Sequence, residues 1–214
     1  PLTCHRSACI PKTAADLKYR LKKMRRVESF MKDIQKVLVV GAGTMGSGIV
    51  QITAQSGFQV FINDVSEDRL NAAMALIEKN YRRSVSAGMM TEAELAEAMA
   101  RITPTTNLND GADVDMVIEA IIEKPEAKKD LFEQLSQICR PDVIMASNTS
   151  TVSISDIASI SDHPENYIGL HFFNPPAKMK LIEAVTGFFT SKETMETCVW
   201  FSEKLGKQCI TSED

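Results

Sequence analysis

The sequence lacks the features that mark several protein classes. None of its apolar runs reaches the roughly 20 residues needed to cross a membrane, so an integral membrane protein is excluded and no membrane partner is expected. The five cysteines match neither a disulfide framework nor a metal-binding spacing, which indicates a reducing compartment and predicts no metal site. No internal repeat or low-complexity segment is present. The 214 residues suffice for one large domain, or one and a part, with a hydrophobic core.

Positive charge is scarce beyond the first 32 residues. Those 32 residues carry nine Lys/Arg against two acids, whereas the rest carry 15 against 26, a net charge of −11. An acidic body argues against a nucleic-acid-binding surface, so no nucleic-acid partner is expected.

The basic segment 1–30 has little apolar periodicity and precedes Met31, which resembles a natural start. We expect two parts: residues 1–30, a basic leader outside the fold, and residues 31–214, a dinucleotide-binding domain. The leader is interpreted as a cloning remnant or a translated upstream region, with an organelle-targeting segment as the alternative. The expected location is the cytoplasm, or the mitochondrial matrix if the leader is a targeting segment.

Residues 37–48 form the stretch around which the chain is organised. The apolar run 37–40 is too short for a helix and leads directly into G-x-G-x-x-G at Gly41, Gly43 and Gly46. This pattern, followed by helical spacing, predicts the first strand, turn and helix of a dinucleotide-binding unit. Gly41 is expected to allow a sharp turn, Gly43 to admit a pyrophosphate, and Gly46 to bring the helix close to the strand. The phosphates would then lie at the positive end of the helix that begins near Thr44.

A second strand, 58–63, delivers Asp64 at its end, about twenty residues beyond the glycines, where a ribose-binding carboxylate is expected. The alternative is a glycine turn in another kind of α/β domain, with Asp64 merely capping the next helix. The agreement of strand, glycines, helix and carboxylate favours the dinucleotide site.

The remaining periodicity alternates between helices and strands. A helix starts at Ser66, and its Lys79, Arg82 and Arg83 could meet a phosphorylated substrate or, as we favour, form a solvated face. A capping box, Thr91 with Glu94, starts another helix that ends near residue 100. Strands are predicted at 115–120, 143–146, 167–170 and 181–185. A helix is predicted from Pro125, with Ala127, Leu131, Leu135 and Ile138 at its apolar positions. Two more helices are predicted at 154–158 and at 192–205, the second with Gly206 as its C-cap. The order predicts an α/β fold, a Rossmann-type doubly wound, mostly parallel sheet.

Four separated motifs carry a resemblance to a known family. They are G-A-G-T-M-G at 41–46, V-I-E-A-I-I-E at 117–123 with the following Lys128, S-N-T-S at 147–150 and H-F-F-N-P at 171–175. In this order they resemble the amino-terminal domain of the NAD-dependent L-3-hydroxyacyl-CoA dehydrogenases, from about Lys36 to the end of the chain. The resemblance implies oxidation of the 3-hydroxyl of an acyl-CoA, with NAD as the cofactor, in fatty-acid or butanoate metabolism. A 3-hydroxybutyryl-CoA dehydrogenase is one member that fits.

The resemblance also implies the catalytic residues. His171 would be the general base, Glu183 its partner, and Ser150 a catalytic and substrate-binding residue. Imidazole suits the removal of a hydroxyl proton near neutral pH, and a carboxylate on its other nitrogen would fix the tautomer. The turn-forming residues 174–177 would let the chain fold back and bring His171 and Glu183 together.

The cofactor site implied by the resemblance adds Asn174, Glu123 and Lys128 to the residues of the glycine stretch. The complete expected set is Gly41, Gly43, Thr44, Met45, Gly46, Asp64, Glu123, Lys128 and Asn174. In the family, a helical second domain follows and supplies the dimer interface and part of the acyl pocket. This second domain is absent from the sequence, so we expect homodimerisation only when it is present. Two other interpretations stay open, a catalytically inactive NAD-binding module and another NAD-dependent hydroxy-acid dehydrogenase.

Overall fold

The computed structural model describes residues 32–214, and the predicted leader 1–30 lies outside the described residues. The strands of this part are β1 (Lys36–Val40), β2 (Gln59–Asn63), β3 (Ile102–Thr105), β4 (Met116–Glu119), β5 (Ile144–Ser147), β6 (Tyr167–Phe172), β7 (Leu181–Thr186) and β8 (Gln208–Glu213). The α-helices are α2 (Thr44–Gln55), α3 (Glu67–Ser86), α4 (Glu92–Ala100), α5 (Pro125–Ile138), α6 (Ile154–Ala158) and α7 (Lys192–Lys204), with short 3₁₀ turns at Leu108–Gly111 and Pro164–Asn166.

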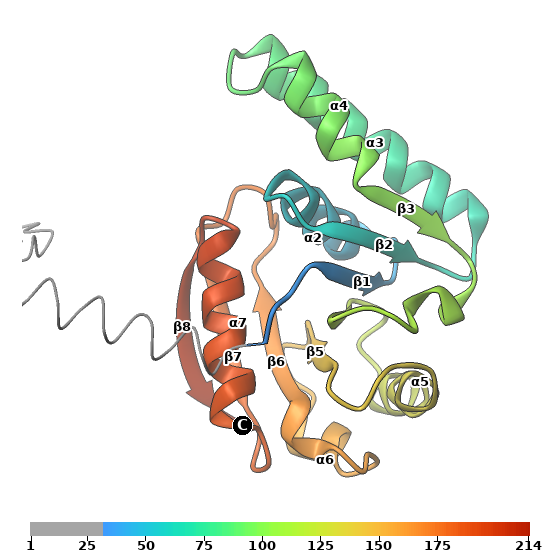
Figure 1. Cartoon of the computed structure of the whole chain (residues 1–214), viewed down its shortest axis with the longest axis vertical. Helices are drawn as coiled ribbons and strands as arrows, with labels where there is room; N and C mark the ends of the chain where they lie inside the picture. Colours follow the sequence, from blue (N-terminus) through green and yellow to red (C-terminus); the bar gives the residue numbers. More distant parts are fainter. Residues whose placement is uncertain (1–31) are drawn as a thin grey trace, which may run out of the picture. The chain divides into compact units, whose positions relative to one another are not determined.

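All eight strands belong to one sheet in the order β3-β2-β1-β4-β5-β6-β7-β8 (Figure 1). Every neighbouring pair is parallel except β6 and β7, which run antiparallel. The order reverses at β1, which lies between β2 and β4, and such a switch point is where open α/β sheets bind ligands beyond their carboxyl ends. The predicted doubly wound, mostly parallel fold is therefore confirmed.

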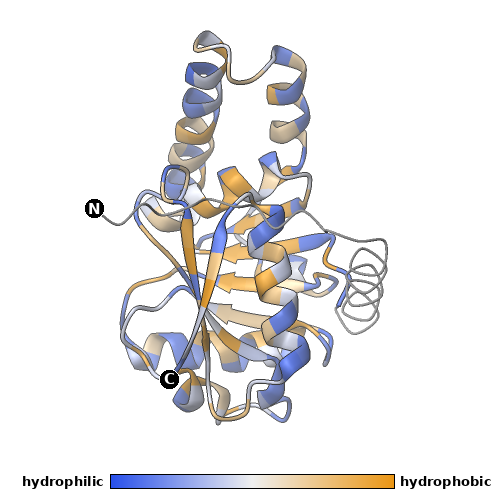
Figure 2. Ribbon diagram, turned by 90° about the vertical axis from the view of Figure 1, so that its left-hand side faces the viewer, coloured by the Kyte–Doolittle hydropathy of each residue, from blue (hydrophilic) through white to orange (hydrophobic). Residues whose placement is uncertain are grey.

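Helices cover both faces of the sheet. One core cluster joins α2, α3, α4 and α7 to strand residues such as Val37, Val39 and Ile118, and the other joins α5 and α6 to Leu38, Val40 and others of the opposite face. This alternation along β1 follows from the two-residue repeat of a strand whose two faces are both buried. Helices α3 and α4 pack against each other and extend as a pair past the sheet (Figures 1 and 2).

The helix starts follow the capping signals in the sequence. Thr91 and Glu94 form the predicted capping box, in which the Thr91 N–H donates to Glu94 Oε2 at 2.7 Å and the Glu94 N–H to Thr91 Oγ1 at 3.2 Å. Ser66 caps α3 and Ser191 caps α7. Gly206, with φ of +71°, follows the end of α7, where the left-handed conformation favours glycine.

Three expectations need correction. Strands β3 and β8 were not predicted, because both are short or exposed and alternate weakly. Of the apolar positions predicted for α5, Leu135 is buried as expected, whereas Ala127, Leu131 and Ile138 are only half-buried. The other buried residues of this helix are Lys128 and Phe132. In this orientation Lys128 lies 2.7 Å from the buried carboxylate of Glu119 at the end of β4. In addition, β6 continues to Phe172, so His171 lies inside the strand rather than after it.

Candidate functional site

The glycine loop has the geometry of a dinucleotide-binding turn. Gly41 has φ of +107°, and a Cβ atom there would lie 2.6 Å from the Ala120 carbonyl oxygen. A Cβ on Gly46 would lie 1.7 Å from the Gly41 carbonyl oxygen. The loop therefore closes on itself at Gly46. The close packing predicted for Gly46 is against the loop carbonyl more than against the β1 side chains.

Neither the backbone conformation nor the packing around Gly43 requires a glycine at this position. It adopts an extended conformation with φ of −76°, and a Cβ would meet nothing within 4 Å. It is the N-cap of α2 and offers no side-chain cap, so the first N–H groups of the helix stay available. Gly43 and Thr44 are exposed, and Met45 is half-buried beside them. Open space over bare helix N–H groups fits the pyrophosphate of a dinucleotide.

Asp64 is held beside this loop. It is only 8% exposed, its Oδ2 accepts the Ala42 N–H at 2.9 Å, and its Oδ1 accepts the Ser66 N–H at 3.0 Å. Helix α3 is capped by the Ser66 side chain, so Asp64 does not have the helix-capping role of the alternative interpretation. Each carboxylate oxygen keeps a lone pair for a ribose hydroxyl.

Lys128 lies under the sheet edge and not on the surface. The side chain is 1% exposed, and its Nζ lies 2.7 and 2.8 Å from the two Glu119 carboxylate oxygens and 3.1 Å from Glu123 Oε2. An ammonium group has three donors, and these three contacts use all of them. Glu119, itself 0% exposed, also accepts the Ser147 hydroxyl at 2.5 Å. Lys128 thus orients the carboxylates of Glu119 and Glu123 in this structure.

Glu123 fixes the loop that follows β5. Its Oε1 accepts the Thr149 hydroxyl, the Ser150 N–H at 3.0 Å and the Thr151 hydroxyl at 3.3 Å. Burial alone would raise the pKa of Glu123, but the hydrogen bonds from Thr149, Lys128 and Ser150 and the Lys128 charge together lower it to about 2. The carboxylate is therefore ionised throughout the neutral range and holds Ser150 at the sheet edge.

The structure brings His171 and Glu183 together. They are directly opposed in the antiparallel β6–β7 pair, and His171 Nδ1 lies 3.3 Å from Glu183 Oε2. The two side chains are 20% and 29% exposed, and the His171 ring lies 4.6 Å from the Phe173 ring, centroid to centroid. A half-buried imidazole with one nitrogen on a carboxylate and the other free can accept a proton from a bound molecule.

A cleft of about 280 Å³ runs in front of this pair. Ser150 and Thr149 line it from the loop after β5, His171 and Glu183 from the sheet, and Ser212 from β8. Asn174 is exposed in the turn after β6 and does not belong to this lining. The predicted catalytic residues thus share one cleft, while the glycine loop and Asp64 belong to β1 and β2 at the switch point.

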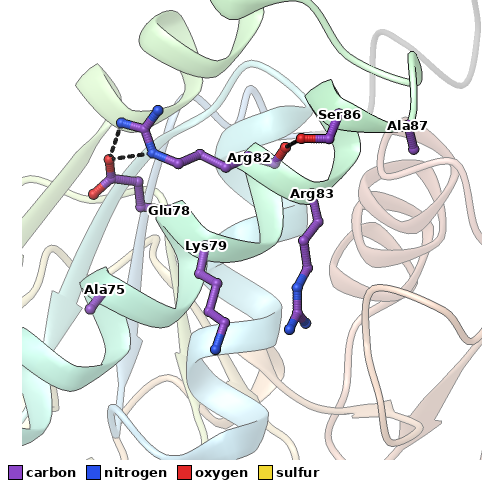
Figure 3. A pocket seen from close by; sticks show the side chains of 7 residues that line it. All are labelled: Ala75, Glu78, Lys79, Arg82, Arg83, Ser86 and Ala87. Atoms are coloured by element: carbon purple, nitrogen blue, oxygen red, sulfur yellow. Dashed lines mark hydrogen bonds and ion pairs between the residues drawn. The ribbon is translucent and has the colours of Figure 1, made fainter.

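The larger hollow, of about 650 Å³, lies on the outer face of α3 (Figure 3). Its lining residues all come from α3 and its C-cap, and Arg82 is paired with Glu78, Nη2 to Oε1 at 2.6 Å. Figure 3 shows Lys79 and Arg83 extending from the helix, with no hydrogen bond or ion pair to the other residues drawn. A wall made of one helix does not enclose a ligand, in agreement with the favoured solvated face.

Sequence reasoning missed Glu119, Thr149 and Ser212 as members of the site. In the sequence, Glu119 lies within an apolar strand and Thr149 is one of several neighbouring polar residues, so neither stands out. Ser212 belongs to β8, a strand that was not predicted. No local pattern marks them, because their partners are distant in the sequence. Among residues 32–214 no helix could span a membrane, and no group of three potential ligands could hold a metal ion.

Comparison with known proteins agrees with this geometry. The profile described as "3-hydroxyacyl-CoA dehydrogenase, NAD binding domain" matches residues 36–214. The chain belongs to this family. It is 45% identical over 181 residues to the 3-hydroxybutyryl-CoA dehydrogenase of Bradyrhizobium diazoefficiens, covering 85% of this chain and 62% of that protein.

Two crystal structures of relatives in the family have the same fold. The 3-hydroxybutyryl-CoA dehydrogenase of Escherichia coli superimposes with a TM-score of 0.84 at 38% identity, over 85% of this chain and 39% of that one. The (S)-3-hydroxybutyryl-CoA dehydrogenase of Ralstonia eutropha gives 0.83 at 37%, over 85% and 64%. The chain thus spans less than two thirds of the length of these relatives. The family assignment confirms NAD as the cofactor of this domain.

Proposed function

We propose that the protein acts in the oxidation of the 3-hydroxyl of a short-chain 3-hydroxyacyl-CoA to the ketone, or in the reverse reduction. The observation that carries the proposal is the His171–Glu183 pair, 3.3 Å apart, in a cleft at the sheet edge of a dinucleotide-binding fold. The names of the relatives, which act on 3-hydroxybutyryl-CoA, support this substrate class. NAD, when bound, accepts the hydride that leaves the substrate carbon.

The residues of the chain supply the proton chemistry in this proposal. When the His171 Nδ1–H donates to Glu183, Nε2 is free to take the hydroxyl proton of the substrate. Glu183 then stabilises the imidazolium, and Ser150 at the cleft donates a hydrogen bond to the reacting oxygen. Glu123, which holds the Ser150 backbone, keeps this donor in place.

The cofactor residues have separate roles. Gly43, Thr44 and Met45 would receive the pyrophosphate, and Asp64 the adenosine ribose. Glu123 and Asn174 remain candidates for contacts with NAD, since both reach the surface near the loops after β4 and β6. For Lys128 we propose an indirect role through Glu119 and Glu123.

The domain division and the assembly are part of the proposal. We infer that residues 31–214 form the NAD-binding domain. We also infer that homodimerisation and part of the acyl pocket depend on the C-terminal part of the relatives, which this chain does not cover. The expectation of a cytoplasmic or a mitochondrial location depends on residues 1–30, outside the described part.

The test is an assay of acetoacetyl-CoA reduction with NADH, in the chain extended by the remaining C-terminal residues of the Bradyrhizobium relative. We expect turnover that requires the CoA thioester and is lost in His171→Ala. Cofactor binding without turnover would favour the inactive module. Equal reduction of free acetoacetate, which lacks the CoA thioester, would favour another hydroxy-acid dehydrogenase.

A further inference from the structure

The hydroxyl of Ser212 contacts the Glu183 oxygen that does not face the histidine. Ser212 Oγ lies 3.0 Å from Glu183 Oε1, while Glu183 Oε2 lies 3.3 Å from His171 Nδ1. The carboxylate is therefore held from both sides, by β8 and by β6. Ser212 is half-buried and lines the same cleft as the pair.

The sheet register explains why the three side chains meet. Glu183 is opposite His171 in β6 and opposite Ile210 in β8. Ser212 follows Ile210 by two residues, so it lies on the same face and is a diagonal neighbour of Glu183. A hydroxyl at this position reaches the carboxylate without crossing the sheet.

Hydrogen bonds to other elements hold the backbone of β8 in place around Ser212. The Ser212 carbonyl oxygen accepts the Thr186 hydroxyl at 3.2 Å. Two residues later, Asp214 Oδ2 accepts the Ser153 hydroxyl at 2.7 Å and the Ser155 N–H at 2.8 Å, which joins the end of the strand to α6. The hydroxyl is thus presented from a fixed backbone, as a positioning contact requires.

We propose that Ser212 is a positioning residue that acts through Glu183 on His171. With Oε1 bound by Ser212, the carboxylate cannot rotate freely, and Oε2 stays directed at Nδ1. The neutral imidazole then carries its proton on Nδ1 and leaves Nε2 without one. The consequence for catalysis rests on the proposed function, but the tautomer itself does not.

The first test measures the tautomer without turnover. Nitrogen NMR of labelled histidine is recorded in the 214-residue chain, at a pH where the imidazole is neutral, with His171 assigned by its loss in His171→Gln. We expect Nδ1–H in the parent, and a shift of about fivefold toward Nε2–H in Ser212→Ala, the effect of one ordinary hydrogen bond. Ser212→Thr, which keeps the hydroxyl, should restore the parent ratio. The control Thr211→Ala, at the exposed neighbouring position on the other face of β8, should not change it.

An unchanged tautomer ratio in Ser212→Ala, or a parent that already carries Nε2–H, would overturn the proposal. A large fall in melting temperature with no change in this ratio would likewise assign Ser212 a purely structural role. None of these outcomes depends on whether the enzyme turns over acyl-CoA.

The second test asks whether Ser212 acts through Glu183. In the extended chain, Ser212→Ala should lower kcat about fivefold with KM for NADH unchanged. In a Glu183→Ala background the same change should have no further effect, because the partner is gone. An equal loss in both backgrounds would show that Ser212 works independently. Absence of turnover in the parent would contradict the proposed function and leave the tautomer test standing.

Discussion

The site depends on carboxylates whose partners decide their roles. Glu119 is fully buried and paired with Lys128, Glu123 holds the loop that carries Ser150, and Glu183 faces His171. All three are acidic residues at one sheet edge, yet only Glu183 meets an imidazole. Their chemistry therefore follows from their neighbours and not from their residue type.

The pairing of His171 with Glu183 predicts coupled losses of activity. His171→Ala and Glu183→Gln should each lower kcat by more than about a hundredfold, the range of a lost general base, while NAD affinity changes little. The double variant should be little worse than the poorer single one, because groups that act as a unit are not additive. Steady-state kinetics of the extended chain measure this. Fully multiplicative losses would show independent action, and near-normal kcat in His171→Ala would remove it as the base.

Asp64 predicts a preference for NAD over NADP. Its buried carboxylate beside the Ala42 N–H should accept ribose hydroxyls and repel a 2′-phosphate. Asp64→Ser should weaken NAD binding about tenfold, the effect of a lost hydrogen bond to a charged group, and narrow the difference from NADP. Calorimetric titration of the 214-residue chain measures both, with the exposed Asp68→Asn as control. Equal or tighter binding of NADP by the parent would contradict this role for Asp64.

Glu123 predicts a pH dependence of stability. Its pKa in the folded chain is about 2, below the ordinary value of 4.5, so the folded state favours the ionised form. The stabilisation is complete above pH 4.5 and is lost as the pH falls toward 2. Glu123→Gln should cost about 1 kcal/mol at neutral pH, a figure reduced because the side chain is partly exposed.

Urea unfolding of Glu123→Gln across this range, beside the exposed control Glu133→Gln, measures the effect. The cost should shrink toward acid only for Glu123. A cost that is independent of pH would contradict the prediction.

At the scale of the elements, α2 and the turn after β6 are in close contact. A Cβ on Gly48, in the second turn of α2, would lie 2.9 Å from two ring atoms of Pro176. This contact joins the helix of the dinucleotide loop to the segment that follows His171. The relative position of the cofactor and the base thus depends on a glycine outside the G-x-G-x-x-G pattern.

Gly48→Ala should destabilise the fold despite the better helix propensity of alanine. Propensity favours the change by about 1 kcal/mol, whereas overpacking against a buried ring costs about 1–3 kcal/mol. We expect a net loss of about 1 kcal/mol and a lower kcat. Adding Pro176→Ala, which removes the opposing ring atoms, should recover the loss. Thermal unfolding measures the stability, and a stabilised Gly48→Ala would contradict the contact.

At the scale of the whole molecule, cofactor binding and turnover are expected to separate. The glycine loop, Asp64 and the core that supports them all lie within residues 32–214. NAD at a hundred times its Kd should stabilise the chain by about 2.7 kcal/mol, visible as a higher melting temperature. Turnover of acetoacetyl-CoA by the 214-residue chain should remain low, because it does not include the C-terminal part of its relatives. In our proposal that part completes the acyl pocket and helps to exclude water from it.

Thermal scans with NAD and NADP, and rates beside the extended chain, measure these expectations. Comparable rates for the two chains would show that the uncovered length is dispensable. No shift of the melting temperature with NAD would contradict cofactor binding by this chain.

The sequence by itself determined the elements whose signals are local. The strand-glycine-helix unit at 37–55, the carboxylate at Asp64 and the capping box at Thr91 follow from the spacing of neighbouring residues, and the structure agrees. The doubly wound fold also followed, because alternating helical and extended periodicities admit few other arrangements.

The tertiary structure decided what depends on register between distant strands. The antiparallel pairing of β6 and β7 places Glu183 opposite His171, and the parallel addition of β8 brings Ser212 to the same carboxylate. A shift of one residue in the pairing of these strands would turn the side chains to the other face of the sheet. No local sequence pattern predicts this register. The burial of Lys128 was decided in the same way, because its charge is tolerated only where the fold has already placed Glu119.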